Sequence, residues 1–349
     1  MDKNSPPPTS ICVLRLSAIG DVCHAVATVQ AIQNQWPSTK ITWVIGKIEA
    51  QLLVNLENIE FVIFDKKAGL KGYRDLYRQL KGRKFDHLLH MQVALRASLA
   101  TLCISAKKKW GFDSSRAKEG QWLFTNHQIS PQKHPHVAEG FWGFAKAIGA
   151  CNKDKPEWQM PVSEVDKQWS RQLTGTKNYL VISPAASKAE RNWSIPSYAA
   201  IAEYAAKKGL SVVLSGGPSP MELQLGKEIQ QIAQTTVINL IGKTNLPQLL
   251  ALLEQATLVL APDSGPAHMA SSVNTPVIGL YAHSNPMRTG PYNSKSLTVS
   301  IYPELLKKQT GKSIEENVWG KRVKGEDLMS QISIESVKEK VDLVLARSE

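Results

Sequence analysis

The sequence of 349 residues predicts an α/β protein made of two doubly wound halves, and three observations support this prediction. First, short apolar runs rich in strand-forming residues alternate with stretches in which apolar residues recur at helical spacing. Second, the alternation stops in the polar segment 151–176, which contains two prolines, and then starts again. Third, 42% of the residues are hydrophobic and 21% are charged, which supports packed cores and excludes wholesale disorder.

In the first half, four apolar runs predict strands, and the stretches between and after them predict helices. The predicted strands cover residues 11–16, 41–45, 61–64 and 85–91. The predicted helices cover residues 21–35, 49–56, 73–80, 96–104 and about 136–148. Strands that alternate with helices in this way run parallel, so we expect helices on both faces of a sheet.

The second half repeats the pattern. Its predicted strands cover residues 179–183, 211–214, 237–241, 258–260 and 277–281. Its predicted helices cover residues 196–208, 221–232, 246–255, 266–272 and about 334–346. We therefore expect an N-terminal domain over residues 1–165, a C-terminal domain over 166–330 and a final helical segment over 331–349. In such folds ligands bind at the carboxyl ends of the strands, here in a central cleft that the two domains face.

Charge and cysteine usage narrow the class of protein. Lys and Arg number 42 and Asp and Glu 30, for a formal net charge of +12, and residues 1–165 hold 22 of the bases and 14 of the acids. This excess predicts an anionic partner: a phosphate-bearing substrate, nucleic acid or an acidic membrane face. The four cysteines have no CxxC spacing, the polar N-terminus is not a secretory signal, and no apolar run approaches the length of a bilayer. We expect a cytoplasmic protein.

The first candidate site segment joins the first predicted strand to the first predicted helix. It contains Arg15, Ser17, Gly20 and Asp21. Asp21 at the start of the helix is either an N-cap or a functional carboxylate, and His24, one turn on, is an alternative candidate or a buried core histidine. No GxGxxG motif is present, and a carboxylate at this position would repel the phosphates of a dinucleotide.

Two further segments follow strands of the second half. Ser187, Lys188 and Arg191 form either a diphosphate-binding loop or a solvated charged loop. The run that contains Asp263, Ser264, Gly265 and His268 places small residues at a helix N-terminus, where backbone N–H groups bind anions. The alternatives there are a capping Asp263 and a structural His268. Two more loops at predicted strand ends contain candidate site residues. One lies near Glu222, and the other contains Lys243 and Thr244.

The motifs together resemble glycosyltransferase family 9, the ADP-heptose:lipopolysaccharide heptosyltransferases. The resemblance rests on R-L-S-A-I-G-D at 15–21, G-G-P followed by a Glu at 216–222, and D-S-G-P-A-H-M-A followed by P-V-I-G-L-Y at 263–281. It extends from about residue 10 to 345, and M-Q-V-A-L-R-A-S at 91–98 is similar to the acceptor-side segment of heptosyltransferase I-like members.

The resemblance implies a GT-B fold whose final helix crosses back to pack on the N-terminal domain. It also implies an inverting transfer that needs no metal or cofactor, with ADP-heptose as donor and Kdo-lipid A as acceptor. An enzyme acting on such an acceptor is expected at the cytoplasmic face of the inner membrane as a peripheral protein. The dispersed bases do not favour nucleic acid as a partner; their one tight cluster, 107–109, is interpreted as a solvated edge or a membrane-facing patch.

The resemblance also implies roles for individual residues. Asp21 is the expected general base. The expected acceptor side comprises Arg15, Ser17, Gly20 and Arg96. The expected donor side comprises Ser187, Lys188 and Arg191 for the diphosphate or sugar, Asp263 for the heptose, Ser264, Gly265 and His268 for the diphosphate, Glu222 for the ribose, and Lys243 and Thr244 for the adenine. The chain departs from some members at Ala186, which lacks a hydroxyl, and at Arg191, which replaces a lysine.

Two other classes of function stay open from the sequence. One is a related enzyme on the same fold, either a transferase for another nucleotide sugar or a nucleotide-sugar epimerase. The other is a non-catalytic basic binding protein. Turnover of a panel of nucleotide sugars separates the first class from a heptosyltransferase, and a gel shift with nucleic acid tests the second.

Overall fold

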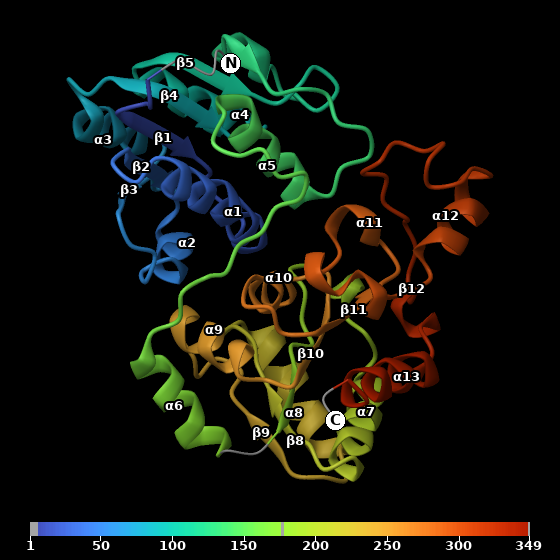
Figure 1. Cartoon of the computed structure of the whole chain (residues 1–349). Coiled ribbons are helices and arrows are strands. Elements are labelled where there is room, and N and C mark those ends of the chain that lie inside the picture. The colour runs from blue at the N-terminus through green and yellow to red at the C-terminus, as the bar shows by residue number, and fades with distance from the viewer. Residues whose placement is uncertain (1–5, 176–177, 348–349) are drawn as a thin grey trace. The chain divides into compact units, whose positions relative to one another are not determined.

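The computed structural model describes residues 6–175 and 178–347, and the chain divides into two compact units, Met1–Met160 and Pro161–Glu349 (Figure 1). The boundary lies a few residues before the one expected after residue 165. Residue 165 falls inside helix α6 (Glu164–Thr174), which packs on α9 (Leu246–Glu254) of the second unit. The break therefore comes before α6, in the proline-containing segment.

The first unit is built on a six-stranded, wholly parallel sheet with the strand order β3-β2-β1-β4-β5-β6. Its strands are β1 (Ser10–Leu14), β2 (Lys40–Ile45), β3 (Ile59–Ile63), β4 (Phe85–His90), β5 (Ala106–Gly111) and β6 (His127–Gln128). The first four were predicted. Strand β5 was missed because its sequence is AKKKWG, which shows neither an apolar run nor a clean alternation.

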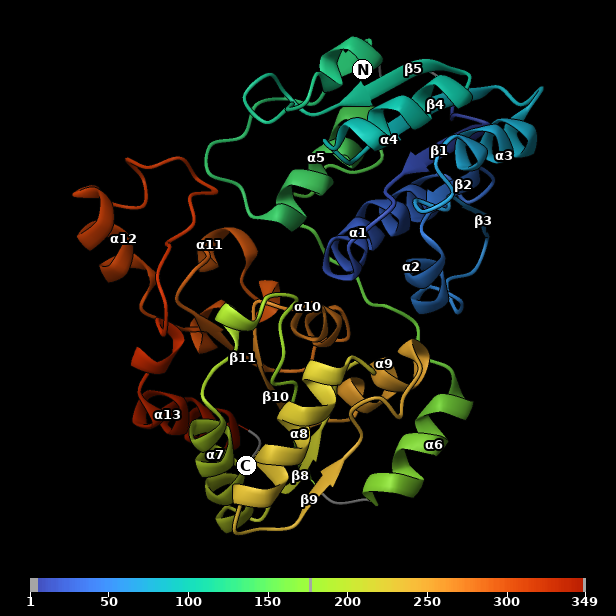
Figure 2. The ribbon, with the colours of Figure 1, turned by 180° about the vertical axis from the view of Figure 1, so that it is seen from behind.

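Helices cover both faces of this sheet, as expected. They are α1 (Ile19–Gln35), α2 (Lys47–Leu52), α3 (Leu70–Leu80), α4 (Leu95–Ala100) and α5 (Val137–Ile148), with short 3₁₀ turns η1 (Thr101–Cys103) and η2 (Gln121–Phe124). Helix α1 packs against α5 and α2 on one face. Helices α3 and α4 share a hydrophobic cluster on the other face, the one turned toward the viewer in Figure 2.

The second unit repeats this architecture with the strand order β12-β11-β10-β7-β8-β9, again wholly parallel. Its strands are β7 (Tyr179–Ile182), β8 (Ser211–Leu214), β9 (Val237–Asn239), β10 (Leu258–Pro262), β11 (Val277–Tyr281) and β12 (Val299–Ser300). Besides α6 and α9, its helices are α7 (Ile195–Lys207), α8 (Pro220–Ile232), α10 (Gly265–Ser272), α11 (Pro286–Thr289), α12 (Tyr302–Thr310) and α13 (Ile334–Leu345). Its 3₁₀ turns are η3 (Ala189–Arg191), η4 (Tyr292–Leu297) and η5 (Met329–Gln331).

Helix α13 belongs to the second unit. The stripe of Val337, Val341 and Val344 is buried as predicted, but in the core of the second unit, where α13 packs on α7 (Figures 1 and 2). The Tyr204 hydroxyl of α7 donates to Asp342 Oδ2 at 2.7 Å and strengthens this contact. The apolar face of this helix is thus covered by α7, and its packing on the N-terminal domain stays a prediction.

Each sheet has one switch point, the place where successive strands stop being added on one side of the sheet and start being added on the other. In the first unit this point lies between β1 and β4, and in the second between β7 and β10. The loops that leave the carboxyl ends of such neighbouring strands diverge to opposite faces, which opens a crevice for ligands. No helix within the described residues is long and apolar enough to cross a bilayer.

Candidate functional site

The switch point of the first unit brings the loops after β1 and β4 together. The Arg15 guanidinium donates from Nη1 to the Met91 carbonyl oxygen at 2.6 Å, and the Leu16 N–H donates to Gln92 Oε1 at 2.8 Å. Both bonds join residues at the carboxyl end of β1 to residues that follow β4. Two predicted segments, 15–21 and 91–98, therefore lie side by side, as the topology requires.

Arg15 and Asp21 form an ion pair at this switch point. The Arg15 side chain is only 12% exposed and its guanidinium lies 5.0 Å from the centre of the Phe141 ring, so it is held in place from two sides. The Asp21 carboxylate is 33% exposed. The cation thus fixes the orientation of the carboxylate and leaves part of it accessible to a reactant.

The interpretation of Asp21 as an N-cap is wrong. Helix α1 begins at Ile19, its N-cap is Ala18, and Asp21 is the third helical residue. The Asp21 carboxylate accepts a bond from the Ala18 backbone N–H at 3.3 Å, which is the acidic half of a capping box. Asp21 therefore supports the helix start through one oxygen, while Gly20 is buried beneath the turn and Ser17 is half-buried in the loop before it.

His24 is a core residue. It is 1% exposed, and its ring meets the rings of His136 and Trp158 edge to face, with centroid separations of 5.3 and 5.8 Å. This aromatic cluster lies between α1 and α5 and supports the structural alternative for His24. Arg96, in contrast, is exposed as the second residue of α4, and it makes no ion pair with any residue the structure describes.

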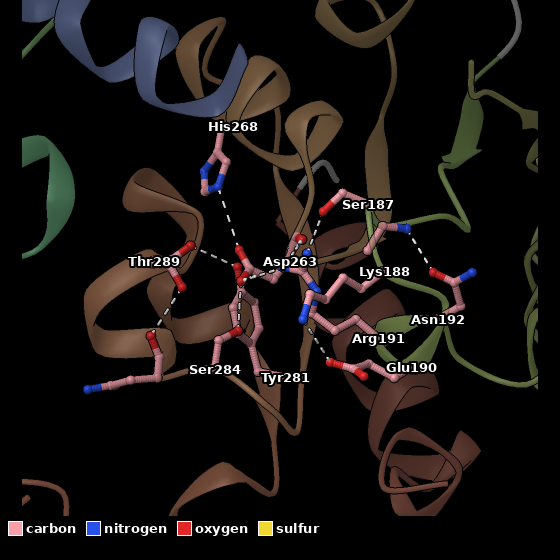
Figure 3. A network of polar contacts seen from close by, with 12 residues as sticks. Ser187, Lys188, Glu190, Arg191, Asn192, Asp263, His268, Tyr281, Ser284 and Thr289 are labelled. Atoms are coloured by element: carbon pink, nitrogen blue, oxygen red, sulfur yellow. Dashed lines mark hydrogen bonds and ion pairs between the residues drawn. The ribbon is translucent and has the colours of Figure 1, made fainter. Parts of the chain in front are cut away.

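The switch point of the second unit is centred on Asp263 and Arg191 (Figure 3). Arg191 is 8% exposed, and its Nη1 donates to the Asp263 carbonyl oxygen at 3.2 Å and lies 3.3 Å from Asp263 Oδ2. Its Nη2 donates to the Ser187 hydroxyl at 2.6 Å. A guanidinium thus connects the loop after β7 to the end of β10, and it brings three predicted donor-side residues together.

Asp263 is held as a carboxylate by its neighbours. The Ser284 hydroxyl donates to Oδ2 at 2.7 Å, and His268 Nε2 lies 3.8 Å from Oδ1. Burial alone raises the pKa of Asp263, but His268, the Ser284 hydroxyl and the charge of Arg191 outweigh it, so the net pKa lies below its ordinary value. Burial and the Asp263 charge raise the pKa of nearby Tyr281 well above its ordinary value, so this phenol stays neutral.

The start of α10 presents hydrogen-bond donors without protein acceptors. Ser264 is the N-cap but makes no side-chain capping bond, and its Oγ is buried with no partner among the described residues. The buried Nε of Arg191 likewise lacks an acceptor in this part of the chain. The first-turn N–H groups of Gly265 and Ala267 have no helical carbonyl within reach. Donors of this kind at a helix N-terminus favour an anion with oxygen acceptors.

The remaining donor-side residues lie on neighbouring loops of the same sheet edge. Glu222 accepts from the Gly217 N–H at 2.5 Å and from the Ser219 hydroxyl at 3.1 Å, so its carboxylate orders the loop after β8. Lys243 donates to the Asn239 carbonyl at 2.9 Å, and Thr244 follows it on the loop after β9. Lys188 is 61% exposed and lies 3.7 Å from Glu190, which places it at the surface of its loop.

Comparisons with known proteins identify the family of this chain. The profile of glycosyltransferase family 9 (heptosyltransferase) matches residues 73–318. The chain is 46% identical over 331 residues to the lipopolysaccharide core heptosyltransferase OpsX of Haemophilus influenzae, and the match covers 95% of both chains. The chain belongs to glycosyltransferase family 9.

Solved structures of the family share the fold. A glycosyltransferase family 9 protein from Veillonella parvula matches with a TM-score of 0.79 at 23% identity, over 97% of each chain. The Escherichia coli heptosyltransferase WaaC, solved with ADP, matches with a TM-score of 0.73 at 19% identity, over 96% of this chain and 99% of that one. The predicted family and the predicted GT-B class are thereby confirmed.

In this family 9 chain, one site residue escaped the sequence analysis. Ser284 follows β11 within the polar run His283-Ser284-Asn285, and all three side chains are buried. A buried polar run directly after an apolar strand, on the edge already marked by Asp263, was the signal that could have found it. No group of three His, Cys, Asp or Glu side chains in the described ranges is placed to hold a metal ion.

Proposed function

We propose that this protein transfers heptose from ADP-heptose to the Kdo-lipid A inner core of lipopolysaccharide. The observation that carries the proposal is the set of buried donors without protein acceptors around Asp263 and the start of α10, in a chain 46% identical to a lipopolysaccharide core heptosyltransferase. A sugar diphosphate supplies the oxygen acceptors that those donors lack.

The donor is held by the second unit. Arg191 Nε, the Ser264 hydroxyl and the N–H groups of Gly265 and Ala267 bind the diphosphate, with Lys188 at its exposed side. Arg191 and Ser187 already contact each other, so the guanidinium is preorganised and little side-chain entropy is lost on binding. Asp263 accepts hydroxyl groups of the heptose. Glu222, Lys243 and Thr244 line the neighbouring loops on the side of the nucleoside.

The transfer is an inverting displacement at the anomeric carbon and proceeds without a metal. As the bond to ADP breaks, negative charge grows on the departing phosphate oxygen. Arg191 and the helix N-terminus stabilise that charge from fixed positions, which is the function a divalent cation serves in other transferases. The acceptor hydroxyl attacks from the opposite face of the sugar ring and loses its proton as the new bond forms.

Asp21 takes that proton as general base. Its carboxylate is 33% exposed and is oriented by Arg15, so part of it is accessible to the acceptor. A hydroxyl is a weak acid, and a carboxylate accepts its proton late in the transition state, when the new bond is largely formed. Arg15, Ser17, Gly20 and the exposed Arg96 form the acceptor side and contact carboxylate or phosphate groups of the inner core.

The experiment that tests the proposal is mass spectrometry of purified Kdo-lipid A after incubation with the protein and ADP-heptose. We expect the acceptor to gain one heptose, and the gain to persist in excess EDTA after dialysis. UDP-glucose and GDP-mannose serve as matched donors and should give no product. Turnover of one of these and not of ADP-heptose would indicate a related transferase instead, and a loss of activity in EDTA that Mg²⁺ restores would contradict the metal-free mechanism.

Because the acceptor is lipid-linked, we also propose peripheral contact with the cytoplasmic face of the inner membrane.

A further inference from the structure

One face of the first unit exposes large apolar side chains that its core does not use. Leu95 and Leu99 of α4 and Leu102 of η1 are 48%, 38% and 68% exposed, and they follow helical spacing along one side. Trp122 and Leu123 of η2 are 54% and 76% exposed, and η2 lies beside α4. We call these five residues the α4–η2 face. Single exposed apolar residues are common on protein surfaces, whereas a contiguous group marks an interaction site.

The α4–η2 face is held in place by buried polar contacts beneath it. Gln121, the residue before Trp122, is fully buried; its Nε2 donates to the His90 carbonyl at 3.0 Å and its Oε1 accepts from the Phe112 N–H at 3.1 Å. Glu119 accepts from the Leu95 N–H at 2.7 Å and ties the loop to the start of α4. The sequence therefore anchors this turn firmly and still presents Trp122 and Leu123 to solvent.

The segment of the chain that carries this face is basic. Residues 70–123, which run from α3 through η2, contain 12 Lys and Arg and 4 Asp and Glu. Their excess of eight equals the whole excess of residues 1–165. Helix α3 lies beside η1 and carries the exposed bases Lys71, Arg74 and Arg78. Arg96 lies on α4 between two of the exposed leucines and is itself exposed.

We propose that the α4–η2 face docks on an anionic lipid bilayer. Tryptophan and leucine enter the boundary between headgroups and acyl chains, and the surrounding Lys and Arg attract anionic headgroups. The charge favours an anionic bilayer over a second copy of this chain as the partner of this face. A second copy would bring the same net positive surface against it. The inference rests on the proposed lipid-linked acceptor, since docking here places Arg96 at the depth of the acceptor's charged inner core.

The test is sedimentation of the full chain with vesicles that contain no acceptor. One set is phosphatidylethanolamine with about one-third phosphatidylglycerol, and the other is phosphatidylcholine alone. We expect the protein to bind the anionic vesicles and to bind the neutral ones at least about tenfold more weakly. Raising NaCl from about 0.1 M to about 0.5 M should weaken binding to the anionic set through screening.

The variant Trp122→Ala/Leu123→Ala should lower binding to anionic vesicles by at least about tenfold, because two side chains lose their burial in the lipid. Its matched control is Ile48→Ala/Val54→Ala, which removes residues of similar exposure, 60% and 64%, in and just after α2, the helix that contacts α1. The control should bind like wild type. Leu123→Glu is a second variant that should lower binding without removing the tryptophan.

Three outcomes would overturn the inference. The first is unchanged vesicle binding in Trp122→Ala/Leu123→Ala and in Leu123→Glu. The second is equal binding of the wild type to neutral and anionic vesicles. The third is a wild-type dimer in sedimentation velocity that these variants convert to monomer. Heptose transfer to a delipidated, water-soluble Kdo acceptor separates this inference from the proposed function. The variants should keep that transfer while losing vesicle binding, whereas a wild-type protein that binds vesicles but transfers no heptose would contradict the proposed function alone.

Discussion

Asp21→Asn offers the sharpest test of the proposed mechanism, because the structure lets its effects on rate and stability be estimated separately. Removal of a general base lowers the rate about 10²–10⁴-fold, equivalent to about 2.7–5.5 kcal/mol in activation free energy. Asparagine keeps an oxygen that accepts the bond from the Ala18 N–H, so the capping contact survives. The substitution is therefore expected to affect turnover far more than folding.

The expected loss of stability comes from two contacts. The ion pair with Arg15 is lost, and for a carboxylate that is 33% exposed this amounts to about 0–1 kcal/mol. A negative charge in the first turn of α1 is also lost, which amounts to about 0.3–1 kcal/mol. Together these remain below about 2 kcal/mol, a fraction of the usual free energy of unfolding of a domain. Asp21→Asn should therefore stay folded at assay temperature.

The assay combines three measurements on one preparation: ADP release at saturating donor and acceptor, thermal unfolding, and calorimetric titration with ADP. We expect turnover to fall at least about 100-fold while ADP affinity stays at the wild-type value. Asp154→Asn is the matched control in the same unit, since Asp154 is 97% exposed and, among the residues that the structure describes, pairs only with Lys146. Turnover near the wild-type value in Asp21→Asn would refute the assignment of Asp21 as the base.

Three other substitutions test the remaining parts of the site. Arg191→Ala should weaken ADP binding about 10–150-fold in calorimetry, which corresponds to the loss of about 1.5–3 kcal/mol for a charge-assisted hydrogen bond. Lys188→Ala, at the surface of the same loop, should weaken ADP binding less. Equal losses of ADP affinity in the two variants would contradict the central role of Arg191. Arg96→Ala should raise the acceptor KM and leave ADP affinity unchanged, and a loss of ADP affinity would place Arg96 on the donor side. Ser284→Ala should lower the free energy of unfolding by about 1–3 kcal/mol at neutral pH. Because the folded-state pKa of Asp263 lies below its ordinary value, the carboxylate stabilises the fold above that ordinary value and loses this contribution as pH falls through the folded pKa. The difference between Ser284→Ala and wild type should shrink in acid, and a difference that persists there would show that the serine acts through packing.

The sequence predicted the parallel sheets because buried strands such as β1 and β10 are apolar at every inward position. It missed β5, whose three consecutive lysines carry no such signal. In the structure Lys107 pairs with Asp86, and Lys109 donates to the Thr101 carbonyl, so these lysines are held by partners on neighbouring segments. Contacts of this kind depend on the tertiary fold and leave no local pattern.

The start of α1 and the partner of α13 show two further limits of local reasoning. An aspartate before an apolar-periodic stretch favours the N-cap position, yet the backbone turns into the helix three residues earlier, at Ala18. For α13, periodicity identifies the buried stripe of valines correctly but says nothing about which surface covers it. The segments that follow strands were predicted better, because parallel topology alone places the segments that carry Asp21, Arg191 and Asp263 after the carboxyl ends of strands.

The two switch points repeat one arrangement with a single difference that matches their proposed roles. In each, an arginine that is at most 12% exposed follows the first strand of the sheet and binds both a carboxylate and the backbone carbonyl at the end of the neighbouring strand. Arg15 binds Asp21 and Met91, and Arg191 binds Asp263. The guanidinium thus closes the gap that the diverging loops leave in each sheet. Asp21 is 33% exposed and shares its carboxylate with one backbone N–H, whereas Asp263 is 12% exposed and also accepts from Ser284. A carboxylate that takes a proton from an incoming hydroxyl has to remain accessible, whereas a carboxylate that positions a bound sugar works better when it is held rigidly. The difference in exposure therefore supports Asp21 as the base and Asp263 as a binding group.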